Sequence, residues 1–174
     1  MIIAAVRCEK EFEEALNSNV SIIFDLSPSI LSLEEKVNKA HSKKKKLFIH
    51  LDLAEGIGKD KEGVKFAKKI GVDGIISTRV NIIKIAREEN LFTVQRFFIV
   101  DSQSVNTTIE AVKSSKPSMI EIMPGILEKV VKKLKNEINI HIIAGGLIET
   151  QAEIEASLDA GASAVSTGKK EFWR

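Results

Sequence analysis

Two glycine-bearing segments near the carboxyl end of the chain have the residue types of a phosphate site. They are Ala144-Gly145-Gly146-Leu147 and Ser166-Thr167-Gly168. Glycines let backbone N–H groups approach an anion closely, and a helix N-terminus next to them adds positive potential. We therefore predict that Gly145, Gly146, Ser166, Thr167 and Gly168 bind a phosphate group. The alternative is that the glycines only form tight turns.

Carboxylates form a second group of candidate residues. Side chains alternate along a strand, so the parity that places aliphatic residues against helices turns His50, Asp52 and Glu121 toward the other side. We interpret His50 as a hydrogen-bonded core residue. Carboxylates are rarely buried without partners, so Asp52, Glu121 and the nearby Glu55 are candidates for contacts with ligand hydroxyls. Pairing with arginine, binding of a divalent cation and acid–base chemistry remain open alternatives.

Arg96 lies inside the apolar segment Thr93-Val94-Gln95-Arg96-Phe97-Phe98. Burial of a guanidinium is costly unless an anion meets it, so Arg96 is predicted to contact either a ligand phosphate or a carboxylate. Alternation leaves open whether Gln95 or Arg96 faces the interior. Cys8 has no His beside it in the sequence and is interpreted as an inert small residue.

The elements that must position these residues are eight short apolar runs, separated by charged segments of helical period. Such runs are typical of parallel strands buried on both faces. The expected strands are Ile2 to Val6, Val20 to Phe24, Leu47 to Leu51, Gly74 to Ser77, Phe92 to Val100, Met119 to Met123, His141 to Ala144 and Ala162 to Ser166. Their starts are spaced by roughly 23 residues, close to the minimum for a strand, a helix and two loops.

Signals for helix ends occur between these runs. Ser32-Leu33-Glu34-Glu35 and Thr150-Gln151-Ala152-Glu153 have the pattern of capping boxes, and Gly71 and Gly161 are expected just after helix ends. The run Lys43-Lys44-Lys45-Lys46 is interpreted as a solvated turn before a strand.

Eight strands with right-handed helical connections close into a barrel more readily than they form an open sheet. We predict an α/β fold, a small TIM-type (β/α)8 barrel, with residues 1–174 as one domain. Only Thr167 to Arg174 follow the last strand, so the barrel should lack a full eighth helix. The active face of such a barrel lies at the carboxyl ends of its strands, where the candidate residues are found.

Composition agrees with a single globular domain. The chain has 174 residues, 44% of them apolar and 29% charged, with a formal net charge of +2 and one cysteine. These values exclude a disulfide-rich scaffold, and no apolar stretch is long enough for a transmembrane helix or a signal sequence. We expect a cytoplasmic protein that does not associate with membranes.

Seven segments, in order along nearly the whole chain, carry a resemblance to a known family. They are Ile49-His50-Leu51-Asp52-Leu53-Ala54-Glu55-Gly56, Asp73-Gly74-Ile75-Ile76-Ser77-Thr78, Val94-Gln95-Arg96-Phe97, Ile99-Val100-Asp101-Ser102, Glu121-Ile122-Met123-Pro124-Gly125, Ile142-Ile143-Ala144-Gly145-Gly146-Leu147-Ile148 and Ala164-Val165-Ser166-Thr167. With these segments the chain resembles the bacterial glycerol-3-phosphate-responsive antiterminator family. It departs from the family in Gly168-Lys169-Lys170 and in its shorter loops.

The resemblance implies a barrel that responds to glycerol 3-phosphate, binds the mRNA leader of glycerol genes and lets polymerase pass a terminator. It implies an effector ligand with no cofactor, no metal and no catalytic residue. RNA requires a basic surface with aromatic or arginine planes. The candidates near the active face are Lys169, Lys170, Phe172, Trp173 and Arg174. The alternative is an enzyme acting on a small phosphate ester or sugar phosphate, such as an epimerase, isomerase, aldolase or phosphodiesterase.

The missing eighth helix also predicts an oligomer. Without it, the outer faces of the first and last strands should be uncovered, and an exposed apolar seam of this kind usually marks an interface. We expect a possible homodimer whose contact includes the seam and the tail Glu171-Phe172-Trp173. If the tail instead folds back over the seam, the protein can remain a monomer.

Overall fold

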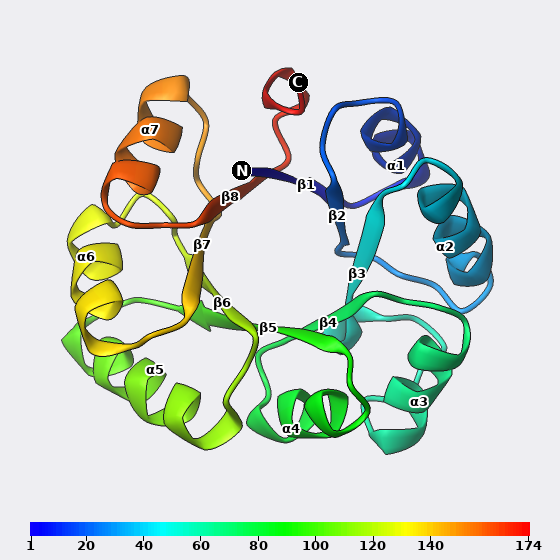
Figure 1. Ribbon diagram of the computed structural model, residues 1–174, viewed down its shortest axis with the longest axis horizontal. Coiled ribbons are helices and arrows are strands. Elements are labelled where there is room, and N and C mark those ends of the chain that lie inside the picture. The colour runs from blue at the N-terminus through cyan, green and yellow to red at the C-terminus, as the bar shows by residue number, and fades with distance from the viewer.

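The protein, described by a computed structural model over all residues 1–174, is a closed eight-stranded parallel barrel surrounded by seven helices (Figure 1). The strands are β1 (Ile2–Val6), β2 (Ile22–Asp25), β3 (Lys46–His50), β4 (Gly74–Ser77), β5 (Phe92–Phe98), β6 (Met119–Met123), β7 (His141–Gly145) and β8 (Ala164–Thr167). The helices are α1 (Glu9–Leu16), α2 (Leu33–Ser42), α3 (Lys61–Lys69), α4 (Val80–Glu88), α5 (Ser102–Ser115), α6 (Glu128–Glu137) and α7 (Gln151–Asp159). The predicted fold class is confirmed.

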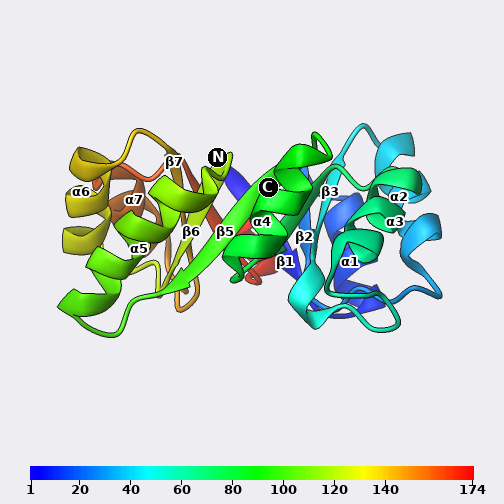
Figure 2. The same ribbon diagram turned by 90° about the horizontal axis from the view of Figure 1, so that it is seen from below.

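The strands pair in sequence order, and β1 closes the barrel by pairing with β8. All eight predicted strands are present, with ends that differ by a few residues from the apolar runs. Figure 2 shows the barrel from the side, with the helices outside the strands. Because all strands are parallel, their carboxyl ends share one edge, where the connections to the following helices lie.

The apolar core has an outer layer and an inner layer. Buried aliphatic side chains fill the space between strands and helices. Inside the barrel, nine buried residues form a separate cluster: Ile3, Ala5, Phe24, Leu26, Phe48, Ile76, Val94, Ile143 and Ala164. Val94 belongs to the inner cluster, so Arg96, two positions further along β5, also faces the interior. Gln95 faces outward, where its Oε1 accepts a hydrogen bond from Ser115 of α5.

The helix-end signals are confirmed in three of four places. Thr150 and Glu153 form the predicted capping box of α7, and Gly71 and Gly161 follow helix ends with φ of 92° and 109°. Ser32 precedes α2 as predicted, but its side chain makes no capping hydrogen bond, so the capping box predicted there is wrong.

The lysine run before β3 is not uniformly solvated. Lys45 is buried, and its Nζ donates to the carbonyl oxygens of Ser18 (2.7 Å) and Val20 (2.5 Å). Burial, followed by the charge of Lys43, lowers the pKa of Lys45. The alternation of exposed and buried side chains entering β3 turns this lysine inward while Lys44 and Lys46 stay exposed.

The tail covers part of the seam between β1 and β8. In place of an eighth helix it forms a single 3-10 turn, η2 (Lys170–Phe172), and Trp173 is 2% exposed. The indole Nε1 of Trp173 donates to the carbonyl of Thr167 (2.8 Å), and its own carbonyl accepts from Asn19 N–H (3.0 Å). The barrel thus lacks a full eighth helix as predicted. Trp173 packs with the core beside α1, while an opening lined by Ile2, Ile154, Leu158 and Phe172 remains between β1 and α7, so the expected uncovered seam is closed only in part.

The homodimer was expected from an uncovered seam, which the tail covers in part. The homodimer stays a prediction. Membrane-spanning segments are not found among the helices, since none combines the necessary length and hydropathy.

Candidate functional site

A cavity of about 290 Å³ opens at the carboxyl ends of the strands. Its charged lining residues are Arg7, Arg96, Glu121, Glu149 and Lys169. Uncharged residues of β1, β6 and β8 and of the loops after β2, β7 and β8 complete the wall: Ala5, Leu26, Met123, Gly146, Leu147, Ile148, Ser166, Thr167 and Gly168. The volume lies at the small end of the range for ligand pockets and suits a small molecule.

A buried ion pair forms the floor of the cavity. Arg96 Nε donates to Glu121 Oε2 at 2.6 Å, and Ser166 Oγ donates to Glu121 Oε1 at 2.5 Å. Arg96 is 6% exposed and Glu121 1% exposed. Adjacent strands bring the pair together, because Arg96 of β5 stands beside Glu121 of β6 in the register. The sequence had left open a ligand or a carboxylate as partner of Arg96, and the partner is Glu121.

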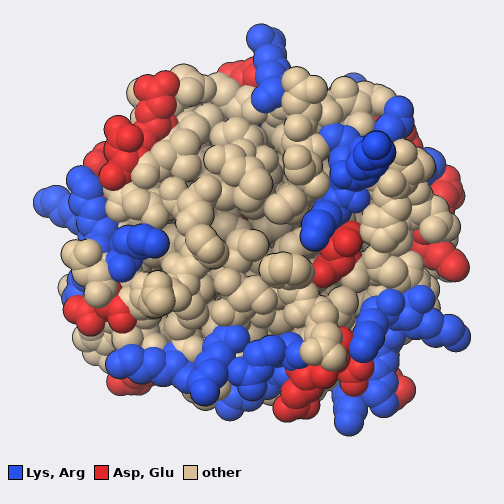
Figure 3. All heavy atoms as spheres, in the orientation of Figure 1, with Lys and Arg blue, Asp and Glu red and all other residues tan.

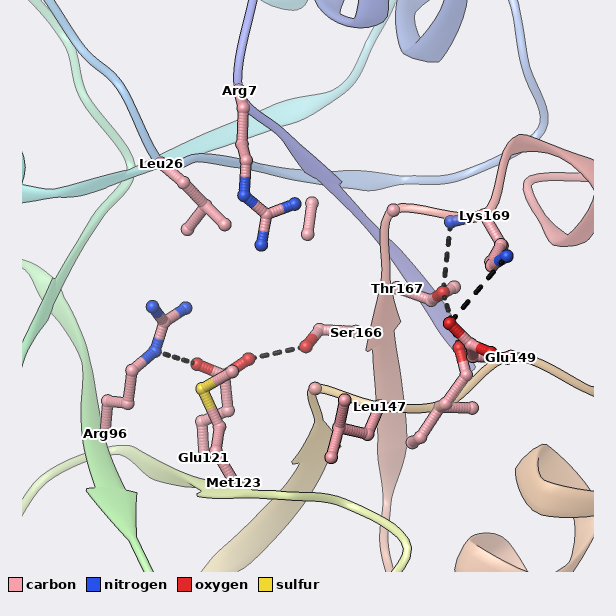
Figure 4. A pocket seen from close by; sticks show the side chains of 14 residues that line it. Arg7, Leu26, Arg96, Glu121, Met123, Leu147, Glu149, Ser166, Thr167 and Lys169 are labelled. Carbon is pink, nitrogen blue, oxygen red and sulfur yellow. Dashed lines mark hydrogen bonds and ion pairs between the residues drawn. The ribbon is translucent and has the colours of Figure 1, made fainter.

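Arg7 and Arg96 enter the cavity from opposite sides. Figure 4 shows the guanidinium of Arg7 above the cavity and the terminal nitrogens of Arg96 pointing up from the floor. Arg7 has no carboxylate within the 4.0 Å limit of an ion pair. Three cationic and two acidic side chains leave the lining with a net positive charge. An anionic ligand would meet Arg7 without having to displace an existing ion pair.

Glycine is required where the floor meets the loop after β7. A Cβ added to Gly145 would lie 2.5 Å from both Glu121 Oε1 and Ser166 Oγ. Gly146 has φ of 73°, and the following Leu147 has φ of 57°. Gly146 has no side chain, so its backbone contributes directly to this wall, next to Leu147 and Ile148. At Gly168 a Cβ would meet its neighbours at 3.5 Å, an ordinary contact, so that position does not demand glycine sterically.

The start of α7 contributes little to anion binding. The backbone N–H groups of Glu149 and Thr150 both donate to Glu153 Oε2, at 2.8 and 2.9 Å. Glu153 therefore occupies the first amides of the helix end whose positive potential was expected to favour an anion. Positive charge at the site comes instead from Arg7, Arg96 and Lys169.

Asp52 and Glu55 do not line the cavity, which corrects their predicted contacts with ligand hydroxyls there. Strand β3 ends at His50 and the chain turns into η1 (Leu51–Leu53), so strand alternation no longer applies at Asp52. Its carboxylate accepts from Ser77 Oγ (2.7 Å) and from Thr78 N–H (2.8 Å) and thereby fixes the loop after β4. Burial acts to raise the pKa of Asp52, but these hydrogen bonds outweigh it and lower the pKa.

Glu55 lies at the surface beside the loop after β2. It is exposed, and its backbone pairs with that of Ser29 in an isolated bridge. Its backbone N–H donates to the carbonyl of Pro28 at 2.8 Å. Glu55 therefore contacts the loop after β2 through its backbone and not through its carboxylate.

His50 faces the interior as predicted but is not fully hydrogen-bonded. It is 3% exposed, and its Nδ1 has no hydrogen-bond partner. Burial, followed by the charge of Arg96, lowers the pKa of His50 to about 4, while Asp52 acts in the opposite direction. The imidazole is therefore neutral at physiological pH.

The predicted RNA-binding tail is divided among three places. Lys169 lines the cavity, with Nζ 3.9 Å from Glu149. Lys170 pairs with Glu14 at 2.5 Å, and Arg174 lies beside the seam with Met1 and Phe172. The three side chains do not form one free basic surface.

Each carboxylate oxygen of Glu121 accepts one hydrogen bond, from Arg96 and from Ser166. No three His, Cys, Asp or Glu side chains gather as metal ligands would. Cys8 is exposed and precedes α1.

Fold and cavity together define a small (β/α)8 barrel with a net positive site at the carboxyl ends of its strands. The chain belongs to the glycerol-3-phosphate responsive antiterminator family, whose sequence model matches residues 2–173. The resemblance stated from the sequence is thereby confirmed. The family is a regulatory one, in agreement with the expectation that the chain is not an enzyme.

Known relatives cover nearly the whole chain. The crystal structure of the glycerol uptake operon antiterminator regulatory protein of Listeria monocytogenes is 34% identical, with a TM-score of 0.94 over 99% of this chain and 94% of that one. An antiterminator-related protein of Thermotoga maritima is 31% identical, with a TM-score of 0.88 over 99% and 96%. The uncharacterized protein YgcP of Escherichia coli (strain K12) is 35% identical over 99% of this chain and 91% of its own length.

Proposed function

We propose that the cavity binds glycerol 3-phosphate and that the bound ligand controls binding of an mRNA leader, so that transcription of glycerol genes passes a terminator. The observation that carries the ligand assignment is the convergence of Arg7, Arg96 and the loop that begins at Gly146 on one small cavity, whose lining does not include Gly145. The family and the Listeria relative support the choice of glycerol 3-phosphate.

The ligand has two chemically different ends, and so has the cavity. Arg7 and the segment Ser166 to Gly168 offer positive charge and donors for a phosphate. At the polyol end, the carboxylate of Glu121 already accepts hydrogen bonds from Arg96 and Ser166, and its remaining lone pairs can accept from ligand hydroxyls. A neutral polyol could use only the second set, so glycerol itself should bind far more weakly.

Antitermination requires a second partner besides the ligand. The name of the family and that of the Listeria relative point to control at a terminator, which is a structure in RNA. We assign the mRNA leader as that partner and the cytoplasm, where transcripts are made in bacteria, as the site of action. No cofactor is needed for this function.

Calorimetric titration of the purified protein tests the ligand assignment. We expect glycerol 3-phosphate to bind, and glycerol at the same millimolar concentration to give no heat. Inorganic phosphate should bind more weakly than the ester, because it leaves the polyol contacts unused. Absence of binding by glycerol 3-phosphate would refute the assignment, and turnover of the ester in the same sample would favour the enzyme alternative.

A further inference from the structure

The amino-terminal end of the barrel carries a second hollow, on the side opposite the ligand cavity. It measures about 240 Å³ and lies at the starts of β2, β3, β5 and β6. Its lining residues are Ser21, Ile22, Lys44, Lys46, Phe48, Phe92 and Met119. Figure 3 shows this face, where lysine and arginine side chains surround an uncharged centre.

We propose that this hollow is the RNA-binding site, where an unpaired base stacks on Phe92 and the adjoining phosphates contact Lys44 and Lys46. The assignment rests on the proposed function, which supplies RNA as the partner. It goes beyond that function because it places RNA at the end of the barrel opposite the ligand.

Phe92 supplies the stacking surface. It is the first residue of β5 and is 47% exposed, although apolar rings are usually covered in a soluble protein. Phe48, which is 2% exposed, lies beneath it with ring centroids 6.2 Å apart. The buried ring holds the exposed one in place. Exposed aromatic rings beside basic groups are the common platform for unpaired bases.

The two lysines beside Phe92, Lys44 and Lys46, have no acidic partner. Neither Lys44 nor Lys46 forms an ion pair, whereas many other lysines do so: Lys36, Lys39, Lys65, Lys68, Lys132, Lys169 and Lys170. Lys46 Nζ stands 5.3 Å from the centroid of the Phe92 ring. Positive charge and an aromatic ring face therefore lie side by side at the hollow. A nucleotide presents the matching groups, a phosphate beside a base.

The basic tail is a weaker candidate for the same partner. Lys170 is paired with Glu14 and Lys169 faces Glu149, so RNA phosphates would have to compete with carboxylates there. Phe172 is only partly exposed and packs against the outer core. Charge and aromatic exposure both favour the amino-terminal hollow.

One packed core connects the two ends of the barrel. Ala5 and Leu26 line the ligand cavity, Phe48 lines the hollow, and all three belong to the inner cluster of nine residues. Phe48 also stacks on Phe24, with ring centroids 5.6 Å apart. A rearrangement of this core by the ligand would reach the surface on which Phe92 rests.

Fluorescence anisotropy with a labelled single-stranded RNA of mixed sequence, in the presence of glycerol 3-phosphate, tests the site. Phe92→Ala should weaken binding roughly 5- to 150-fold, the range found for loss of one stacked base. The double variant Lys44→Glu, Lys46→Glu should weaken it at least tenfold and reduce the salt slope by about 1.4, as expected for two lost phosphate contacts.

The matched control is Lys61→Glu, Lys129→Glu, which makes the same charge change at exposed positions in the first turns of α3 and α6, at the opposite end of the barrel. Negative charge is favourable at helix N-termini, so this control should fold and bind RNA like the wild type. Equal losses in both double variants would overturn the site, because only net charge would then matter.

Photochemical cross-linking of wild-type protein to RNA containing 4-thiouridine avoids reliance on variants. Cross-links to the peptide that contains Phe92 are expected. Cross-links confined to Lys169–Arg174 would overturn the site but leave the proposed function intact, whereas absence of any RNA binding by the wild type would refute both. Binding of a protein instead of RNA at the hollow would also contradict the proposal.

Discussion

Arg96 and Glu121 form an ion pair inside the barrel, with Nε and Oε2 2.6 Å apart and both side chains almost completely buried. Such a pair contributes little net stability when intact, but removal of one partner leaves an uncompensated charge. Because the terminal nitrogens of Arg96 point into the cavity, the same pair orients a cation toward the ligand (Figure 4).

Glu121→Gln should therefore destabilise the protein by about 3–5 kcal/mol, because Arg96 loses its counter-charge. Urea denaturation measures the free energy of unfolding. Glu155→Gln, at an exposed position on α7, is the control and should change it by less than about 0.5 kcal/mol. An unchanged midpoint for Glu121→Gln would show that the pair does not support the fold.

Arg7→Ala should weaken binding of glycerol 3-phosphate while leaving stability nearly unchanged. Arg7 is exposed and has no carboxylate partner, so the fold does not depend on its charge. Loss of a hydrogen bond to a charged group costs about 1.5–3 kcal/mol, or roughly 10- to 150-fold in affinity. Titration calorimetry and a melting curve separate the two effects, and Arg87→Ala on α4 serves as control. Wild-type affinity in Arg7→Ala would remove Arg7 from the site.

Gly145→Ala and Gly168→Ala should differ sharply. A Cβ at Gly145 would collide with Glu121 and Ser166 at 2.5 Å, so this variant should lose ligand binding and at least about 1–3 kcal/mol of stability through overpacking. A Cβ at Gly168 makes only 3.5 Å contacts, so its stability should remain within about 1 kcal/mol of the wild type. If the two melted alike, the steric account of the loop after β7 would be wrong.

His50 should make stability depend on pH between 6.5 and 4. Its folded-state pKa of about 4 lies below the ordinary value of 6.5, so the unfolded chain binds the proton more readily. Stability is full above pH 6.5 and falls as the pH drops toward 4, by as much as about 3 kcal/mol. His50→Gln should flatten this part of the profile. Parallel profiles for wild type and His50→Gln would contradict the prediction.

Trp173→Ala should destabilise the barrel by about 3–5 kcal/mol, because it leaves a cavity where the tail closes the seam between β1 and β8. Arg174→Ala changes an exposed neighbour and should have little effect. Light scattering on the intact protein tests the homodimer, and the same measurement on Trp173→Ala shows whether opening the seam changes the association of the protein. A stable, monomeric Trp173→Ala protein would show that the tail is dispensable.

The sequence was sufficient to predict the barrel, because its strands are marked by continuous apolar runs at regular intervals. It also predicted Gly145, Gly146, Ser166, Thr167 and Gly168 as neighbours, since the carboxyl ends of adjacent strands must meet. Asp52 was misplaced because strand alternation was extended past His50, where the backbone turns. The end of a strand is set by tertiary contacts such as that of Asp52 with Ser77, which one sequence does not reveal.

Other features depended on three-dimensional pairing. The sequence could not decide whether Arg96 or Gln95 faces the barrel interior. The fold decides it by placing their partners, Glu121 inside the barrel and Ser115 on α5. Arg7 was not among the candidate site residues, because nothing in the local sequence shows that its guanidinium enters the cavity. Its position just after β1, directly beside β8, was the signal that could have identified it.

The affinity of the protein for the mRNA leader of the glycerol genes, measured with and without saturating glycerol 3-phosphate, tests the central claim most directly. Coupling of about 1–3 kcal/mol predicts that the ligand tightens RNA binding roughly 5- to 150-fold, and that RNA tightens ligand binding by the same factor. Equal RNA affinity in both conditions would contradict a ligand-controlled antiterminator.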